Sequence, residues 1–120
     1  MAGMKNFKEL FVWQKSTELI IMIYAVTKNF SAEEKYGLAS QMRRAAVSIA
    51  SNIAEGHLRR TNKDFGQFLS IARGSCAELE TQSIIAERLM YFGKEEYIML
   101  EKKIEEVAKM LSSLYGKVSR

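Results

Sequence analysis

Few side chains in this sequence could support catalysis or bind a metal ion. Cys76 and His57 are the single cysteine and the single histidine. Cysteine-histidine catalysis would have to join these two residues, but Cys76 lies within an apolar stripe and is better interpreted as a small core residue. One histidine cannot supply the paired Glu-x-x-His motifs of a di-iron bundle, and neither a disulfide nor a zinc ligand set can form within one chain. We therefore predict that the protein is not an enzyme and that it carries no cofactor or metal.

A basic run between positions 57 and 63 is the main candidate for a binding site. His57, Arg59, Arg60 and Lys63 place four potential cations within seven residues, and such a cluster can bind phosphates. Thr61 is a predicted helix cap, beside which free backbone amides would favour an anion. No aromatic residue lies among these residues, so we expect any nucleic acid to be contacted through its backbone. The alternative is a solvated turn that only keeps the protein soluble.

The distribution of charge along the chain favours the same region. Residues 41–75 contain six basic and two acidic residues, so the whole formal net charge of +4 belongs to this part of the chain. Arg43 and Arg73 lie in the same window, and we include them as further candidates for contacts with RNA or DNA.

Two polar stripes follow the helical spacing of three and four residues. The stripes consist of Gln41, Arg44, Ser48, Asn52 and Glu55 in one segment, and of Ser75, Glu78 and Gln82 in a later one. We interpret them as a network between two helices, in which the side chains satisfy one another by hydrogen bonds. A small-molecule pocket is the alternative interpretation.

The elements that position these residues are predicted to be four helices. Apolar residues recur with helical spacing at about 9–29, 32–55, 62–92 and 94–115. Ser31 and Glu34 have the spacing of a capping box, which would start the second helix. The glycines predicted to end the second, third and fourth helices are Gly56, Gly93 and Gly116.

Short connections between the helices would turn each one back along its predecessor. We therefore predict an all-α, antiparallel, up-down-up-down four-helix bundle, with residues 1–120 forming a single domain. The apolar fraction of 48% and the absence of proline suit long helices. The longest apolar run, residues 19–26, is too short to cross a membrane, so we expect a cytoplasmic protein with neither a signal peptide nor a membrane span.

Some apolar and small residues lie off the core stripes of the first two helices. Because a helix that is apolar on two sides needs two surfaces to pack against, we predict that these residues form the interface of a homo-oligomer. The predicted interface residues are Trp13, Ile20, Tyr24, Ala39, Val47, Ala50 and Ala54.

Several blocks of the sequence together resemble a known family. They are residues 12–15, the Arg-Arg-Ala-Ala-Val-Ser-Ile block at 43–49, the Asn-Ile-Ala-Glu-Gly block at 52–56, residues 68–75 and residues 78–80. The chain closely resembles, over about residues 7–114, the bacterial four-helix-bundle proteins that are also called 23S ribosomal RNA intervening-sequence proteins. One departure is Ser31, where the family often has proline.

The resemblance implies a non-enzymatic protein that assembles into a ring-like homopentamer and has a role with nucleic acid. Our first hypothesis is therefore a homo-oligomer that binds structured RNA or DNA through repeated copies of the basic turn. The alternative is a protein-interaction scaffold that docks a protein partner, in which the basic turn has no part in binding.

Overall fold

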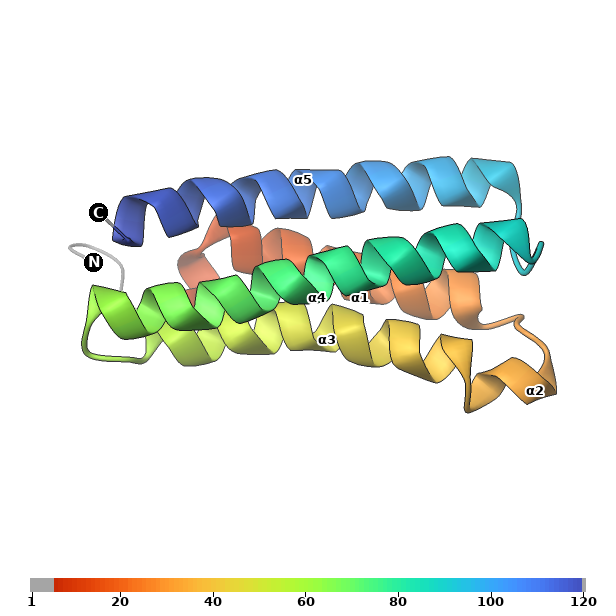
Figure 1. Cartoon of the computed structure of the whole chain (residues 1–120), viewed down its shortest axis with the longest axis horizontal. Coiled ribbons are helices and arrows are strands. Elements are labelled where there is room, and N and C mark those ends of the chain that lie inside the picture. Colours follow the sequence, from red (N-terminus) through yellow and green to blue (C-terminus); the bar gives the residue numbers. More distant parts are fainter. Residues whose placement is uncertain (1–5, 120) are drawn as a thin grey trace.

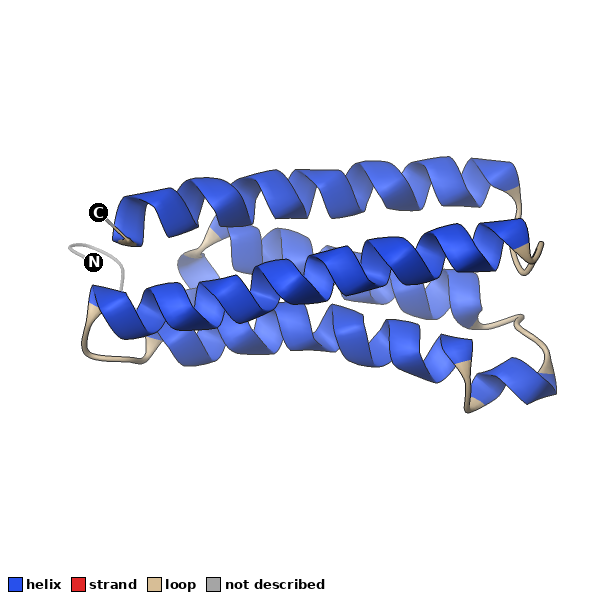
Figure 2. Ribbon diagram, viewed as in Figure 1, coloured by secondary structure: helices blue, strands red, loops and turns tan. Residues whose placement is uncertain are grey.

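The computed structural model describes residues 6–119, apart from the side chain of residue 35. A short 3₁₀ helix, η1 (Phe7–Glu9), precedes five α-helices. These are α1 (Phe11–Thr27), α2 (Ala32–Lys35), α3 (Leu38–His57), α4 (Asn62–Arg88) and α5 (Lys94–Val118). Every regular element in the described part of the chain is helical (Figure 2), so the all-α prediction is confirmed.

The four long helices lie side by side along a molecule that measures 46 × 23 × 20 Å. In Figure 1, α1 and α4 run towards the end of the molecule at which α2 lies, and α3 and α5 run back from it. The most extensive helix pair is α3 with α4, while α5 packs on α4 and on α1. The turn between α3 and α4 therefore lies at the end of the bundle opposite α2.

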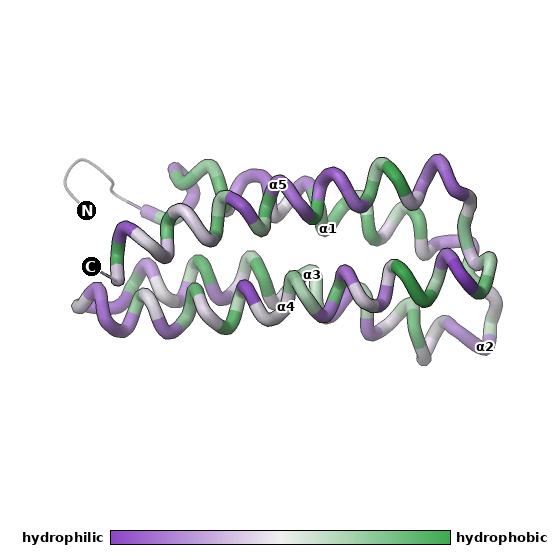
Figure 3. The backbone as a smooth tube through the Cα atoms, turned by 45° about the horizontal axis from the view of Figure 1, so that its top comes forward, coloured by the Kyte–Doolittle hydropathy of each residue, from purple (hydrophilic) through white to green (hydrophobic). Residues whose placement is uncertain are grey.

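One apolar core runs between these helices. Hydrophobic and hydrophilic segments alternate along each long helix (Figure 3), as expected for amphipathic helices that share a core. The largest fully buried aliphatic side chains are Leu19, Ile23, Met42, Ile49, Ile53, Leu69, Leu79, Leu100, Val107 and Leu111. Burying each such side chain contributes about 2 kcal/mol.

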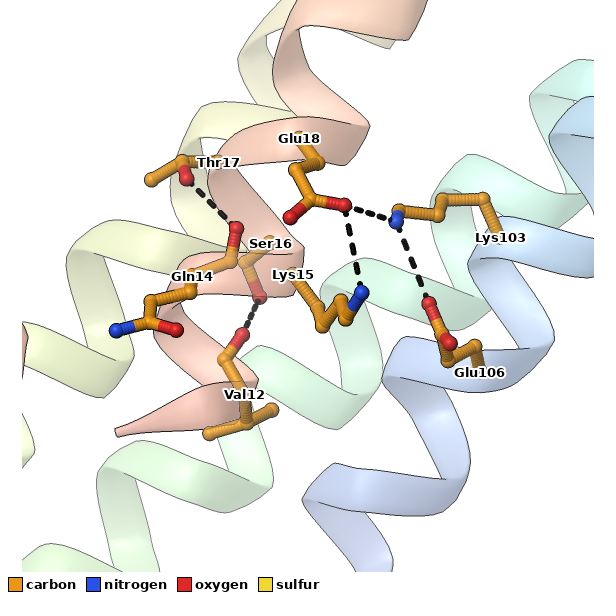
Figure 4. Close-up of polar contacts among 8 residues, drawn as sticks. All are labelled: Val12, Gln14, Lys15, Ser16, Thr17, Glu18, Lys103 and Glu106. Carbon is orange, nitrogen blue, oxygen red and sulfur yellow. Dashed lines mark hydrogen bonds and ion pairs between the residues drawn. The ribbon is translucent and has the colours of Figure 1, made fainter. Parts of the chain in front are cut away.

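Among the described residues, one ion pair joins α1 to α5. Figure 4 shows that Glu18 contacts Lys103 of α5, which also lies 3.3 Å from Glu106. The hydrogen bond from Lys103 lowers the pKa of Glu18, and the same bond raises the pKa of Lys103. On α1 itself, the Ser16 hydroxyl donates to the Val12 carbonyl at 2.6 Å, so this buried polar group is satisfied locally.

The second predicted helix is in fact two helices. The chain leaves the helical path at Tyr36 and Gly37, between α2 and α3. The predicted capping box is wrong, because the Ser31 side chain makes no capping hydrogen bond. Instead, the Glu34 carboxylate accepts the Leu38 backbone N–H at 3.0 Å. This contact satisfies an open amide at the start of α3, and the weak helix propensity of glycine favours a break at Gly37.

Two of the glycines predicted to end helices lie within them. Helix α3 continues through Gly56 to His57, and α5 continues through Gly116 to Val118. Gly56 is buried, and a Cβ atom there would lie 2.7 Å from Cβ of Phe68 and 2.9 Å from Cδ1 of Phe65. The glycine therefore permits a close approach of α3 to α4 rather than a helix end.

The third helix ends earlier than predicted. Helix α4 ends at Arg88, and Met90 has a positive φ of 60°. The Tyr91 N–H donates to the Ala86 carbonyl at 2.9 Å, which is the pattern of a Schellman helix end formed without glycine. Gly93 instead precedes α5, where its N–H donates to the Glu96 carboxylate at 2.8 Å.

Candidate functional site

The turn between α3 and α4 is short and fixed by backbone contacts. Directly after the end of α3, the Leu58 N–H donates to the Glu55 carbonyl at 3.2 Å. The Thr61 hydroxyl accepts the Asp64 N–H at 3.1 Å, so the predicted cap of the next helix is confirmed. Residues 58–63 are exposed, so the side chains of Arg59, Arg60 and Lys63 lie at the surface.

The cations of the turn differ in what they contact. The Arg59 guanidinium donates to the Glu55 carboxylate at 2.9 Å and lies 4.7 Å from the centre of the Phe68 ring. Arg60 and Lys63 are exposed, and neither forms an ion pair with another residue that the structure describes. The most available positive charge at this turn therefore belongs to Arg60 and Lys63, while Arg59 is partly balanced by Glu55.

The structure does not place His57 among the exposed cations. Its ring packs edge-on against Phe65, with ring centres 5.8 Å apart, and the residue is half-buried. The Nδ1 atom is buried and has no hydrogen-bond partner among the described residues. His57 faces the core because it occupies the last turn of α3 on the side that meets α4, so its predicted contact with nucleic acid is not supported.

Arg43 and Arg73 also lie away from the turn. Arg43 lies fourteen residues before His57, the last residue of α3, which corresponds to about 21 Å along the helix axis. Its Nε donates to the Thr27 hydroxyl at 2.9 Å, and its guanidinium lies over the Tyr24 ring of α1. The Arg73 guanidinium lies over the ring of Tyr115 on α5. Both arginines thus join neighbouring helices.

A hollow of about 330 Å³ extends the basic turn along the seam between α4 and α5. Lys63, Gln67 and Ser70 line it from successive turns of α4, and Tyr115 lines it from α5. The sequence analysis missed this hollow because Tyr115 lies far from the basic run in sequence. The polar spacing of positions 63, 67 and 70 on one helix face was the only available signal.

The structure brings together part of the predicted polar network. The hydroxyl oxygens of Ser48 and Ser75 lie 3.0 Å apart across the α3–α4 seam. The Asn52 amide donates to the Ser48 hydroxyl at 3.0 Å and to the Ser48 carbonyl at 2.8 Å. These three residues therefore hydrogen-bond as predicted, and they fix the register of α3 against α4.

The other members of the predicted network do not satisfy one another. Glu55 pairs with Arg59 at the turn, and the buried Gln82 has an Oε1 atom without a hydrogen-bond partner among the described residues. Gln41, Arg44 and Glu78 line a surface hollow of about 390 Å³ together with Ala45 and Ser48. The structure therefore does not support the complete network, because Gln41, Arg44 and Glu78 are exposed at the seam and the buried Gln82 lacks the predicted partner.

Two of the predicted interface residues belong to the interior of the subunit. Ala39 is 1% exposed and Ala50 is 6% exposed, so the prediction that they contact another copy is wrong. Their small side chains serve close packing within the bundle. Trp13 packs edge-on against Phe7, and Ile20 packs against the core. Among the remaining predicted residues, Tyr24 is 46% exposed, Val47 is 39% exposed and Ala54 is half-buried.

Two further observations concern membranes and metals. Within residues 6–119, no helix has both the length and the apolar character needed to cross a membrane. The same part of the chain contains no group of three or more histidine, cysteine, aspartate or glutamate side chains placed to hold a metal ion. Burial raises the pKa of the Cys76 thiol to about 12, which makes this thiol unreactive at neutral pH.

Comparisons with known proteins identify relatives of the chain. Residues 8–113 match the model of a family described as 23S rRNA-intervening sequence protein. A solved structure from Bacteroides thetaiotaomicron VPI-5482, described as a protein with unknown function from the S23 ribosomal protein family, is similar with a TM-score of 0.81. The alignment covers 88% of this chain and 96% of that one at 24% identity, a likeness that shows the fold alone. No curated protein matches the chain.

Proposed function

Because the chain belongs to the 23S rRNA-intervening sequence protein family, we propose that it is a non-enzymatic, cytoplasmic homo-oligomer that binds structured RNA or DNA. The binding surface is the basic turn between α3 and α4, and five copies in a ring present it repeatedly. The observation that carries the proposal is the exposure of Arg60 and Lys63 without an ion-pair partner among the described residues. Exposed positive charge that is not balanced by a nearby carboxylate is available to phosphates.

The surroundings of the turn support the same ligand. The Phe68 ring and the Glu55 carboxylate hold the Arg59 guanidinium in one position at the surface. The adjoining hollow offers the Lys63 ammonium, the Gln67 amide and the Ser70 hydroxyl, which are groups that commonly contact phosphate and sugar oxygens. A single copy would bind weakly through so few cations, but several copies acting on one nucleic acid would gain affinity by avidity.

Exposed apolar side chains along the bundle support self-association. Ile21 is 70% exposed, Ile71 is 51% exposed and Tyr24 is 46% exposed. A surface that leaves such residues in water gains stability when another copy covers them. Light scattering of the purified protein tests this part directly, and a monomer at all concentrations would contradict it.

Binding to a labelled RNA hairpin, followed by fluorescence anisotropy, tests the ligand. We expect the affinity to weaken about a hundredfold between about 50 and 200 mM salt, because binding releases counterions. The double variant Arg60→Glu with Lys63→Glu should lose at least about tenfold in affinity while the oligomer persists. Arg88→Glu with Lys94→Glu is the matched control, since it makes the same change of charge at the opposite end of the bundle. Equal losses of affinity in both double variants, or an affinity that does not change with salt concentration, would refute the proposal.

A protein-interaction scaffold is the second candidate function. The hollow lined by Gln41, Arg44, Ser48 and Glu78 favours it, because Arg44 and Glu78 are both exposed and form no ion pair with each other. Each could receive an opposite charge from a protein partner. A partner that co-purifies without nucleic acid at moderate salt, and is lost on Glu78→Lys, would support this candidate instead.

A further inference from the structure

A third hollow lies between α1 and the first turns of α3, away from the basic turn. It measures about 470 Å³ and is lined by Tyr24, Tyr36, Ser40, Arg43, Arg44 and Val47. Arg44 lies thirteen residues before His57, where α3 ends and the basic turn begins, so the two sites are about 20 Å apart along the helix. The hollow is thus separate from the basic turn, and both aromatic rings and guanidinium groups line it.

The break between α2 and α3 shapes this hollow. Tyr36 lies in the break and is 85% exposed. From there, Ser40, Arg44 and Val47 follow at spacings of four and three, so they share one face of α3. The nearby Glu34 carboxylate accepts the Leu38 backbone N–H at 3.0 Å. This acidic group is therefore engaged elsewhere and does not line the hollow.

The lining groups have complementary chemistry for a nucleotide. The bond from Arg43 Nε to Thr27 and the position of its guanidinium over Tyr24, 4.6 Å from the ring centre, fix the first cation. Arg44 is exposed and forms no ion pair with a described residue, so it supplies a second one. No carboxylate is among the described residues that line the hollow. Arginines suit phosphates, and exposed tyrosine rings offer surfaces on which a base can stack.

We propose that this hollow binds an unpaired nucleotide, with the base against Tyr36 and Val47 and the phosphate beside Arg43 and Arg44. The inference rests on the proposed function, because it assigns to the same nucleic acid a second, single-stranded contact. The preferred ligand is then a duplex with an unpaired flank, in which the basic turn holds the duplex backbone and the hollow holds the flank.

Comparing two RNA hairpins tests the inference. One hairpin has a blunt end, and the other carries a single-stranded oligouridine tail on the same stem. We expect the tail to raise the affinity of the native protein about tenfold, because stacking of one base has about this effect. Tyr36→Ala and Arg44→Gln should each abolish the gain from the tail and leave affinity for the blunt hairpin unchanged. Phe11→Ala is the matched control, since Phe11 is 72% exposed on α1 and lies outside the hollow.

The outcomes separate this inference from the proposed function. A tail that adds no affinity, or a gain that survives Tyr36→Ala combined with Arg44→Gln, overturns the hollow as a nucleotide site while binding of the blunt hairpin stands. If the native protein fails to bind the blunt hairpin, the proposed function falls, and binding of free oligouridine that is lost in Tyr36→Ala still supports the hollow. A polyglutamate peptide that displaces the tail as well as oligouridine does would overturn base recognition, because charge alone would then explain binding.

Discussion

The two ends of the bundle differ in both charge and packing. Where α3 turns into α4, basic side chains lie at the surface, and Gly56 lets the two helices approach closely against Phe65 and Phe68. At the opposite end, where α2 and the α4–α5 turn lie, the packing consists of aromatic contacts of Phe30 with Tyr91 and Phe92. The acidic residues of this second end are Glu33, Glu34, Glu87, Glu95 and Glu96, which outnumber its basic residues Lys28, Lys35, Arg88 and Lys94 by one, and we call it the acidic end.

Contacts at helix termini account for only part of this difference in charge. Each end of the antiparallel bundle holds N-termini as well as C-termini, so the helix dipoles favour neither end. At the starts of α3 and α5, Glu34 and Glu96 accept hydrogen bonds from open backbone amides, and just after the end of α3 the Arg59 guanidinium is balanced by Glu55. The comparison teaches that a charge with such a local partner says little about a ligand. Arg60 and Lys63 form no ion pair with a described residue, so they are the specific evidence for one.

The largest effect is expected from breaking the close packing at the basic end. Gly56→Val should destabilise the protein by about 3 kcal/mol, because the added side chain overlaps Phe65 and Phe68. Urea unfolding measures the loss. Gly66→Ala is the control in the neighbouring helix, since a Cβ there would lie at an ordinary 3.9 Å from Tyr115 and Val118. A Gly56→Val protein as stable as the control would refute the role assigned to this glycine.

A smaller loss is expected from the aromatic packing at the acidic end. Phe30→Ala should cost about 2 kcal/mol, less than full burial of a phenylalanine would imply, because Phe30 is only half-buried against Tyr91 and Phe92. The same urea experiment applies, with the exposed Phe11→Ala expected to change stability by at most about 0.5 kcal/mol. If both variants lose equally, the ring contacts do not hold this end together.

Removing the carboxylate that starts α3 should have a smaller effect still. Glu34→Gln is expected to cost about 1 kcal/mol, since it weakens the acceptor for the Leu38 amide. Amide hydrogen exchange at Leu38 should become faster, while exchange in the middle of α3 stays the same. Glu33→Gln is the neighbouring control and should leave the Leu38 amide protected. Unchanged exchange in Glu34→Gln would show that the cap is not formed in solution.

The smallest effect concerns the pH dependence of the acidic end. The hydrogen bond to Glu101, together with burial and nearby carboxylates, raises the pKa of Tyr97 to about 12. Because folding favours the neutral phenol, its contribution to stability is complete below pH 10 and is lost as pH rises towards about 12. Ultraviolet absorbance of the phenolate should show a late-titrating tyrosine that is absent in Tyr97→Phe. A titration in which Tyr97→Phe removes an early-titrating tyrosine instead would contradict the negative character of this end.

The sequence predicted the long helices well because each one carries its own apolar stripe. The helix ends predicted at glycines were less accurate, because a glycine occurs equally at a break in a helix, at a helix cap and at a close contact between helices. Gly37 lies at a break, Gly56 at a helix contact and Gly93 before a helix start. Only the partner helix distinguishes these cases, and local spacing carries no information about that partner.

The candidate site was predicted where it depends on neighbours in sequence and missed where it depends on neighbours in space. Arg60 and Lys63 are near one another in the chain, so the basic turn was visible from the residues alone. The position of Tyr115 beside Lys63, and of Tyr24 beside Arg43, arises from packing between different helices. Ala39 and Ala50 were wrongly assigned to an interface between copies, because small residues are as common in the interior of a subunit as at an interface.

Three arginines within residues 41–75 lie over aromatic rings, and each does so across a different helix pair. Arg43 joins α3 to α1, Arg59 joins α3 to α4, and Arg73 joins α4 to α5. Lysine has no planar group to lay on a ring. Replacing these arginines by lysine would therefore keep the electrostatic field of the molecule and loosen the fit between its helices, so that net charge alone is a poor guide to which substitutions this bundle tolerates.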